Sequence, residues 1–493
     1  MVKAISRKRW GLLLLPILLL GAILRLIRLG QQSFWWDEVY SANLAAKSLA
    51  TVVPRFGQTP TLYPILLHFW SYMGHSDTML RLLSVLFGII TLWVVYLIGK
   101  NLLDARHGLL CSLLMAISPF HIWYSREARM YSLLILLSAA SVLFFIKFLQ
   151  KQKGWPGVWW ALSTGLAIYT HYYAVFILIF EVAIFLLFWH RYHYRWRSFC
   201  YVLGSLVAMM LPMLFLFFLG GRYATLSAEG AGENPIQLFS ILYTFFAFSL
   251  GLSYGPSIAE LHRCISLTTV QPYLAQILPV ALLFSAIFVL GLGFLWHRRE
   301  KLVFLLLYLI VPIAGASLLS LLWPQISYNV RYVSTALPAY GFILARGLLA
   351  PRNRTIRWVL VLLILTGTFI SLHNYYCVDK YGKADYRSAA QFVSAHSEDS
   401  DVILAPYLEL FKYYYRGPSA VRKLLWSPKL YRKAIKMRVR GFNRTWLVIS
   451  REWKSDPKGE MVDYVRETFP AVLETTFTNL YLGLYETAST QRD

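Results

Sequence analysis

Long runs of apolar residues recur along most of this 493-residue chain, and they constrain its fold more than any other feature. Several runs are about 20 residues long, which is the length that an α-helix needs to cross the hydrocarbon core of a bilayer. Hydrophobic residues make up 57% of the sequence, and the mean hydropathy is +0.51. A membrane β-barrel would instead show short segments of alternating hydrophobicity. The sequence therefore predicts a polytopic α-helical membrane protein.

Basic residues give the chain a formal net charge of +24, and within the apolar part of the chain they cluster in short loops between the apolar runs. Loops such as WHRYHYRWRS and WHRREK fall on one side of the membrane if the chain crosses it about eleven times. This is the positive-inside pattern of cytoplasmic loops, so the charge does not indicate a nucleic-acid partner. We expect about 11 transmembrane helices (range about 10–13), a cytoplasmic N-terminus and a location in the plasma (inner) membrane.

Polarity divides the chain into a transmembrane domain, residues 1–372, and a polar C-terminal part, residues 373–493. Two outer loops of the transmembrane domain are long, residues 30–77 and residues 221–272. The first contains two short apolar stretches, residues 39–49 and 63–72, which are expected to lie as helices along the membrane interface.

The C-terminal part alternates strand-like and helix-like segments, which predicts a small extracytoplasmic α/β domain. The strand-like runs are residues 401–405, 445–450, 472–478 and 481–485, and helix-like segments between them include residues 386–395 and 460–467.

Two adjacent carboxylates, Asp37 and Glu38, follow the first apolar run and stand directly behind Trp35 and Trp36. A charged side chain beside hydrocarbon is costly unless it faces a partner, water or a substrate. One interpretation is an interfacial turn, with the tryptophans at headgroup level and the acids as a solvated flank or helix cap. The other interpretation is a catalytic site.

Further polar residues follow other predicted spans on the outer side of the membrane. Arginine offers a planar fork for phosphate oxygens, and a carboxylate can accept a proton from an attacking hydroxyl. Such a set suits a site that handles a lipid-linked phosphate. Its members are Asp37, Glu38, Arg126, Glu127, Arg129, His171, Tyr172, Tyr173, Asn329, Arg331, Lys383, Asp385 and Arg387.

Structural explanations exist for several of these residues. Arg126 and Arg129 flank Glu127 and could pair with it, as charges in membranes often do. His171 stands at the end of a span, where an amphipathic residue is common, and Arg331 could be an anchor whose long side chain reaches the interface.

The order of the motifs along the chain resembles that of GT-C glycosyltransferases. These motifs are WWDE, TPTLYPILLHFW, SREARMY, THYY, NVRY with ALPA, and KADYRSAAQFV. The resemblance is closest to the protein O-mannosyltransferase and aminoarabinose transferase superfamily, in its prokaryotic glycosyltransferase family 39-like branch, and it covers nearly the whole chain. One departure is Thr61 beside Pro60, where the family has a Pro-Pro before the residue matching Tyr63.

The resemblance implies an enzyme with an active site open to the outer face. It would move a hexosyl or pentosyl group from a polyprenyl-phosphate carrier to a lipid, glycan or protein acceptor, with inversion. The family's catalytic carboxylate matches Asp37, which we expect to act as the base, with Glu38 beside it. The expected substrate-binding residues are Glu127, Arg126, Arg129, His171, Tyr172, Tyr63, Arg331 and Lys383.

Other functions remain open at the level of sequence. A transporter or flippase of lipid-linked sugars would show internal repeats and broken central spans, and a polysaccharide polymerase or ligase would use a similar donor on a different fold. A non-catalytic scaffold would give the outer charges no reason to converge. No cofactor is certain; a divalent metal near Asp37 or Glu127 is an open alternative, although the sequence contains no firm ligand set.

Overall fold

The computed structural model describes residues 7–52, 62–151, 155–220, 238–263, 267–324, 326–424, 427 and 430–487. The chain forms two compact units. The first unit comprises Met1–Leu29, Ala42–Gly251 and Ile277–Ser371, and the second comprises Gly30–Ser41, Leu252–Gln276 and Leu372–Asp493.

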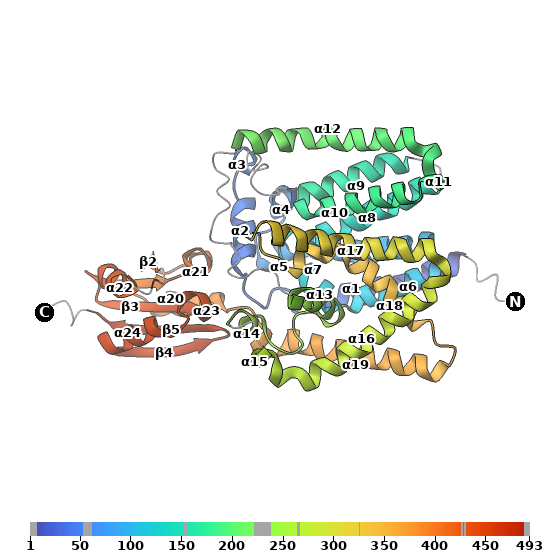
Figure 1. The fold of residues 1–493 in the computed structure, drawn as a ribbon. Coiled ribbons are helices and arrows are strands. Elements are labelled where there is room, and N and C mark those ends of the chain that lie inside the picture. The colour runs from blue at the N-terminus through green and yellow to red at the C-terminus, as the bar shows by residue number, and fades with distance from the viewer. Residues whose placement is uncertain are drawn as a thin grey trace. The chain divides into compact units, whose positions relative to one another are not determined.

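Apolar helices packed against one another build the first unit (Figure 1). The long apolar runs of the sequence form helices. In chain order these helices are α1 (Arg7–Leu26), α5 (Asp77–Leu102), α6 (Ala105–Ile117) with α7 (Pro119–Ser125), α8 (Tyr131–Leu149), α9 (Pro156–Thr170), α10 (Val175–Leu187), α12 (Trp196–Gly220), α16 (Leu274–Leu295), α17 (Arg299–Leu322), α18 (Leu337–Leu348) and α19 (Arg354–Cys377).

Within the described residues, five helical segments are long and apolar enough to cross a membrane, or six if the bent pair α6 and α7 forms one span. One of the five, Gln271–Leu322, contains both α16 and α17. Others are shorter than a typical span: α9 has 15 residues, or about 22 Å against a hydrocarbon core of about 30 Å. The chain is a helical membrane protein, and the count of about eleven spans stays a prediction.

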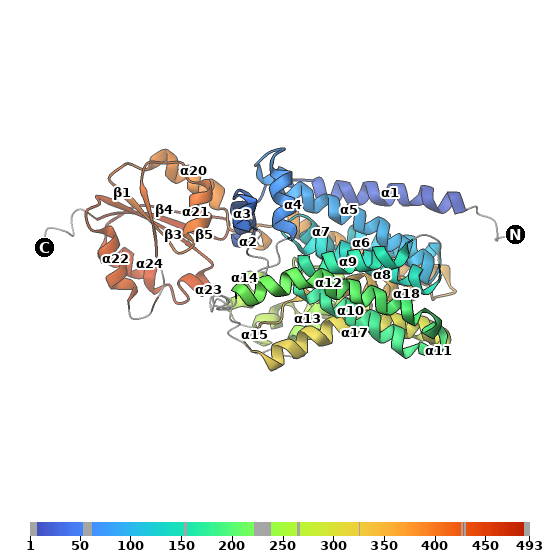
Figure 2. The same cartoon turned by 90° about the horizontal axis from the view of Figure 1, so that it is seen from above.

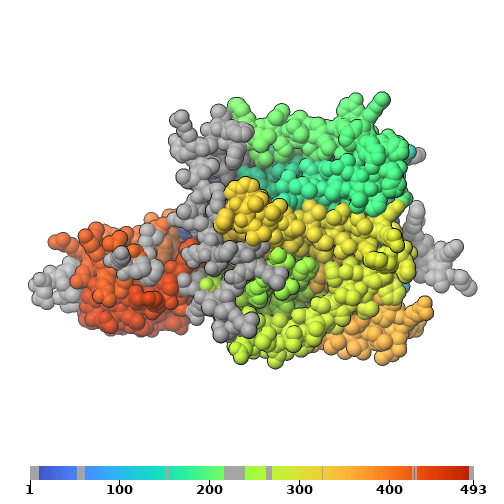
Figure 3. Space-filling view, viewed as in Figure 1, coloured from blue at the N-terminus to red at the C-terminus, as the bar shows by residue number. Residues whose placement is uncertain are grey.

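Large apolar side chains point outward from several of these helices. Tyr201 on α12 is 77% exposed, Val289 on α16 is 64% exposed and Phe369 on α19 is 70% exposed. Figure 3 shows α12 in green and α16 in yellow-green at the surface of the first unit. Exposed apolar area of this extent is expected where lipid replaces water.

A buried acid inside the first unit is matched with hydrogen-bond donors. Glu181 on α10 is fully buried. Its carboxyl group accepts hydrogen bonds from the Trp160 indole N–H and the Ser141 hydroxyl, both at 2.7 Å. Ser141 also contacts the Thr164 hydroxyl at 2.6 Å. Because an unsatisfied polar group is costly in an apolar interior, this network links α8, α9 and α10 specifically.

Short helices occupy the two long loops. The first loop contains α2 (Trp36–Ala45), α3 (Leu49–Val52) and α4 (Leu62–Ser71), and residues 53–61 lie outside the described part of the chain. The second contains α13 (Leu238–Leu250), α14 (Ile258–Arg263) and α15 (Leu267–Val270), and residues 221–237 and 264–266 lie outside it.

The C-terminal residues of the second unit form a mixed five-stranded sheet in the order β2-β1-β3-β5-β4. Strands β2, β1 and β3 are parallel, whereas β5 runs antiparallel to both β3 and β4. The strands are β1 (Asp401–Ala405), β2 (Ala420–Lys423), β3 (Arg444–Ser450), β4 (Ala471–Phe477) and β5 (Leu480–Glu486), and the helices are α20 (Tyr386–His396), α21 (Leu408–Tyr414), α22 (Tyr431–Val439), α23 (Glu452–Ser455) and α24 (Glu460–Thr468).

Helices cover both faces of this sheet: α20 and α21 lie on one face and α22 and α24 on the other (Figure 2). Val402 and Leu404 point toward α22 and α24, where they pack with Ile435 and Val465. On the opposite face, Trp446 of β3 contacts a ring of α20. All five residues of β1 are buried, as expected for a parallel strand covered on both faces.

Candidate active site

The two adjacent carboxylates lie in the first turn of α2, in the second unit. Asp37 is partly exposed, whereas Glu38 is fully buried. The Glu38 carboxylate accepts hydrogen bonds from the Lys383 ammonium at 3.0 Å and from the Trp35 backbone N–H at 3.4 Å. The contact with Trp35 is half of a capping box, in which a Glu at the third helical position reaches back to the residue before the helix. The structure thus pairs two predicted site residues, Glu38 and Lys383.

The position of Asp37 suits contact with a substrate. The N-terminus of a helix carries partial positive charge, which favours an ionised carboxylate in the first turn. The Asp37 carbonyl oxygen accepts a hydrogen bond from the Ser41 hydroxyl at 3.0 Å. A partly exposed carboxylate in a helical turn can accept a proton from an incoming hydroxyl.

In the first unit, two arginines bind backbone carbonyl groups just after α1. The Arg126 guanidinium donates to the Ile27 carbonyl at 2.7 Å, and Arg81 donates to the Leu29 carbonyl at 3.0 Å. Both side chains are buried, with 7% of Arg126 exposed. Arg126, predicted to bind the carrier phosphate, therefore has at least one structural contact.

Arg25 lies inside the first apolar run, and no role was predicted for it from the sequence. Its buried guanidinium donates to the carbonyl groups of Ala116 at 3.0 Å and Met115 at 3.3 Å, near the C-terminal end of α6. It also contacts His121 Nδ1 at 2.7 Å. Because Arg can only donate, Nδ1 is the acceptor of this hydrogen bond. Its position as a cation within an apolar run could have marked Arg25 as a candidate functional residue from the sequence.

Glu127 is buried beside the short helix α7 and is 2% exposed. The indole N–H of Trp123 donates to one of its carboxylate oxygens at 3.0 Å. Its carbonyl oxygen accepts from the Arg129 backbone N–H at 2.7 Å. The hydrogen bond from the Trp123 indole therefore fixes the position of this second carboxylate.

Arg129 and Arg331 meet a group of aromatic rings, here called the arginine–tyrosine cluster. The guanidinium of Arg331 lies 5.4 Å from the Tyr131 ring and 5.4 Å from the Tyr332 ring, and that of Arg129 lies 6.0 Å from the Tyr131 ring. The cluster consists of Arg129, Tyr131, His171, Tyr173, Arg331 and Tyr332, and it draws on α8, the turn η2 (Tyr172–Ala174) and the turn η7 (Val330–Ala336).

His171 lies within this cluster, 5.1 Å from the Tyr332 ring and 5.3 Å from the Tyr173 ring. Its Nδ1 accepts the Tyr173 backbone N–H at 3.3 Å. Burial, together with the positive charges of Arg331 and Arg129, lowers the pKa of His171 to about 3. The imidazole is therefore neutral at physiological pH and can donate or accept a hydrogen bond, but it adds no charge.

The two remaining predicted residues differ in exposure. Tyr63 on α4 is 1% exposed, and its hydroxyl contacts the Ser84 hydroxyl of α5 at 2.8 Å. Tyr172 is exposed at the surface of η2. Among the predicted residues of the first unit, the structure thus gathers Arg129, His171 and Arg331 in one cluster.

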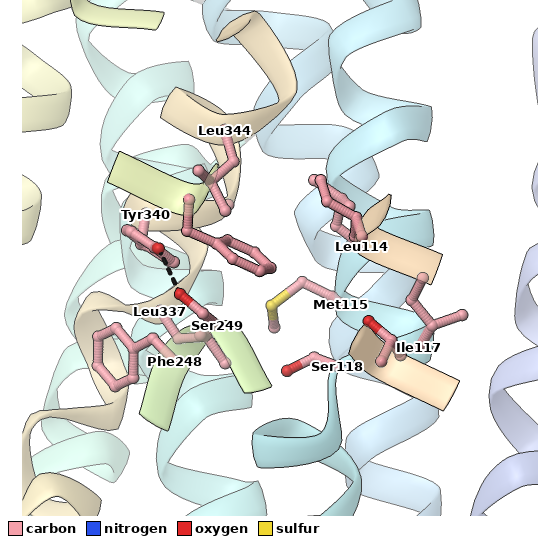
Figure 4. Close-up of a pocket in the computed structure, with 13 residues that line it drawn as sticks. Leu114, Met115, Ile117, Ser118, Phe248, Ser249, Leu337, Tyr340 and Leu344 are labelled. Carbon is pink, nitrogen blue, oxygen red and sulfur yellow. Dashed lines mark hydrogen bonds between the residues drawn. The ribbon is translucent and has the colours of Figure 1, made fainter. Parts of the chain in front are cut away.

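An apolar cavity between α6, α13 and α18 has a volume of about 30 Å³. Figure 4 shows Leu114, Met115 and Phe248 along it, with the Tyr340 hydroxyl bonded to Ser249 at 2.6 Å. Its lining is mostly apolar, so it offers few partners for the hydroxyl groups of a sugar.

The described residues contain no group of three or more His, Cys, Asp or Glu side chains that could hold a metal ion. A divalent metal near Asp37 or Glu127 stays an open alternative without an identified ligand set.

Comparison with known proteins gives two kinds of similarity. Residues 58–218 match the family profile described as dolichyl-phosphate-mannose-protein mannosyltransferase. No curated protein sequence matched the chain. Crystal structures of ArnT from Cupriavidus metallidurans are similar over 98% of this chain and 99% of ArnT, at 12% sequence identity. The TM-score is 0.59 for the apo state and 0.57 for the state bound to undecaprenyl phosphate.

The archaeal oligosaccharyltransferase AglB from Archaeoglobus fulgidus, in complex with an inhibitory peptide and a dolichol-phosphate, is also similar. This match has a TM-score of 0.51 and 11% identity, and it covers 99% of this chain and 75% of AglB. At such low identity the likeness shows the fold. Nearly the whole chain takes part in it, and the chain therefore has the GT-C glycosyltransferase fold that it shares with ArnT and AglB.

Proposed function

We propose that this chain is a membrane glycosyltransferase that moves a hexosyl or pentosyl group from a polyprenyl-phosphate donor to an acceptor on the extracytoplasmic face. The observation that carries the proposal is the fold match to ArnT bound to undecaprenyl phosphate, which spans 98% of this chain. The AglB complex with dolichol-phosphate and the match of residues 58–218 to a dolichyl-phosphate-mannose-dependent family support the same donor class.

Asp37 is the proposed base. The acceptor hydroxyl oxygen attacks the anomeric carbon, and the bond from that carbon to the phosphate oxygen breaks. The polyprenyl phosphate leaves with the bonding electron pair, and Asp37 takes the acceptor proton. A single displacement of this kind inverts the anomeric centre. Because the leaving group is already a stabilised anion, one carboxylate base suffices, unlike the pair of hydrolytic glycosidases.

Arg129 and Arg331 are the proposed ligands of the carrier phosphate. Two guanidiniums in the arginine–tyrosine cluster provide the planar donor groups that match phosphate oxygens. The neutral His171 can add a hydrogen bond without adding charge. Glu127, Arg126, Tyr63 and Tyr172 remain proposed substrate-binding residues.

The decisive experiment measures sugar transfer by purified protein in lipid. The donors are a panel of polyprenyl-phosphate sugars, and the variant Asp37→Asn is assayed in parallel. We expect the wild type to consume one donor and Asp37→Asn to lose about 10² to 10⁴ of the rate, as for the loss of a general base.

Asp399→Asn is the matched control, because Asp399 is an exposed aspartate of the second unit. It should retain full activity. Equal rates for Asp37→Asn and the wild type would show that Asp37 is an interfacial acid and not the base. Movement of the lipid-linked sugar across the bilayer without transfer to an acceptor would favour the transporter interpretation.

A further inference from the structure

The segment Gly30–Ser41, which carries Asp37, is bound to the C-terminal residues of its own unit. The Ser33 hydroxyl donates to the Asp385 carboxylate at 2.8 Å, although the two residues are 352 positions apart. The Arg387 guanidinium donates to the Gly30 carbonyl at 2.9 Å. The Phe34 backbone N–H donates to the Tyr414 hydroxyl at 2.7 Å. These contacts fix the backbone just before Asp37.

Aromatic contacts extend this attachment to Trp35 and to Trp36, the first residue of α2. Trp36 packs against Tyr407 with ring centroids 6.0 Å apart, and the Arg451 guanidinium lies 5.8 Å from the Trp35 ring and 5.2 Å from the Tyr407 ring. Tyr407 follows β1 and Arg451 follows β3, which are adjacent parallel strands. The carboxyl ends of such strands are where open α/β sheets usually bind ligands. In this unit they bind the two tryptophans that precede Asp37.

The ion pair between Lys383 and Glu38 completes the attachment. The ammonium and carboxylate groups are 3.0 Å apart, with 10% of the Lys383 side chain and none of the Glu38 side chain exposed. Lys383 also lies 5.6 Å from the Trp35 ring. A buried charge tolerates little displacement from its partner, because a lone buried charge is strongly disfavoured.

We propose that Lys383 is a positioning residue for Asp37, acting through its ion pair with Glu38, so that the C-terminal domain sets the geometry of the catalytic turn. This inference rests on the proposed function of Asp37 as base. It assigns supporting roles to Glu38 and Lys383 in place of the catalytic and substrate-binding roles expected from the sequence.

The helix geometry explains how the effect reaches Asp37. Consecutive residues of an α-helix point about 100° apart around its axis. Anchoring Glu38 to Lys383 fixes the rotation of the first turn of α2, and that rotation sets the direction of the Asp37 side chain. A misplacement of about 1 Å can cost about 10² in rate when a catalytic group must meet a reacting atom.

The test compares Lys383→Met, Glu38→Gln and the double variant, with kcat and the donor KM expressed per folded protein. Each single variant should lose about 10- to 100-fold in kcat, with the donor KM changed less than about twofold. The double variant should lose no more than the worse single variant, because both changes remove the same ion pair. Lys383→Arg retains the charge and should recover part of the kcat.

Lys412→Met is the control, because Lys412 is an exposed lysine of α21. The proposal is wrong if Lys383→Met retains the wild-type kcat per folded protein, or if the losses of the two single variants multiply. The double variant leaves no buried charge unpaired, so it tests the proposal even if Lys383→Met does not fold. Asp37→Asn is assayed alongside. If Asp37→Asn retains activity, the proposed base is wrong. If Asp37→Asn loses activity but Lys383→Met keeps the wild-type kcat, only the positioning role is overturned.

Discussion

The surroundings of Arg331 suit its proposed role as a ligand of the carrier phosphate. The Asn329 side chain accepts the Arg331 backbone N–H at 3.2 Å and thereby begins the turn η7. The rings of Tyr131 and Tyr332 each lie 5.4 Å from the guanidinium. A guanidinium held against rings loses less conformational freedom on binding than one that moves freely in solvent.

Substitution of Arg331 tests the phosphate-binding role. We expect Arg331→Met to raise the donor KM roughly 10-fold or more, because a charge-assisted hydrogen bond is lost. Arg331→Lys should have an intermediate effect, since an ammonium keeps the charge but not the fork. Steady-state kinetics with varied donor would measure both. Arg352→Met, at an exposed arginine, is the control, and an unchanged donor KM in Arg331→Met would remove Arg331 from the site.

At the scale of elements, the hairpin of β4 and β5 is tied to α24 by one carboxylate. Glu474 on β4 accepts two hydrogen bonds from the Arg466 guanidinium of α24, both at 2.8 Å, and one from the Tyr485 hydroxyl at 2.7 Å. The hydrogen bonds from Arg466 and then Tyr485 lower the pKa of Glu474 to about 2, against an ordinary value of 4.5.

This shift predicts a pH-dependent stabilisation of the hairpin. Because the folded pKa lies below the unfolded one, the stabilisation is complete above pH 4.5 and is lost as the pH falls toward 2. At pH 7, Glu474→Gln should speed hydrogen exchange in β4 and β5 by roughly 2–5-fold, as expected for a partly exposed pair. The difference from wild type should shrink as the pH approaches 2. Glu467→Gln, at an exposed acid of α24, should show no such difference.

At the scale of the whole molecule, local sequence patterns predicted individual strands and helices well, but they did not predict which of these elements contact one another. The runs expected as strands at residues 401–405, 445–450, 472–478 and 481–485 coincide within one residue with β1, β3, β4 and β5. Strand β2 was not predicted, because AVRK is a short edge strand without apolar alternation.

For the candidate site, too, the sequence revealed local features but not the contacts between distant residues. Acids and arginines at the ends of apolar runs were visible as charges out of place. The pairing of Glu38 with Lys383 could not be predicted, because a contact between residues 345 positions apart leaves no periodic pattern in a single sequence. Likewise, Tyr332 is the neighbour of Arg331 in η7, whereas Tyr131 belongs to α8 and is brought to Arg331 only by the fold.

The orientation of the chain in the membrane can be tested with its own cysteines. Cys377 and Cys200 are exposed free thiols, at the end of α19 and within α12 respectively. The predicted topology has Cys377 outside and Cys200 at the cytoplasmic end of its span. A membrane-impermeant maleimide applied to intact cells should therefore label Cys377 and leave Cys200 unlabelled, as read by peptide mass spectrometry. Labelling of Cys377 only after the cells are opened would reverse the predicted orientation.

The attachment of Gly30–Ser41 to the C-terminal residues also imposes an order in time. A ribosome makes Ser33 early and Asp385 352 residues later, which at about 5–20 residues per second is a delay of roughly 20–70 s. Until then the turn that carries Asp37 lacks the partners that shape it. A nascent or truncated chain can therefore occupy the membrane before the turn of Asp37 is complete, and under the proposed function it would not yet transfer sugar.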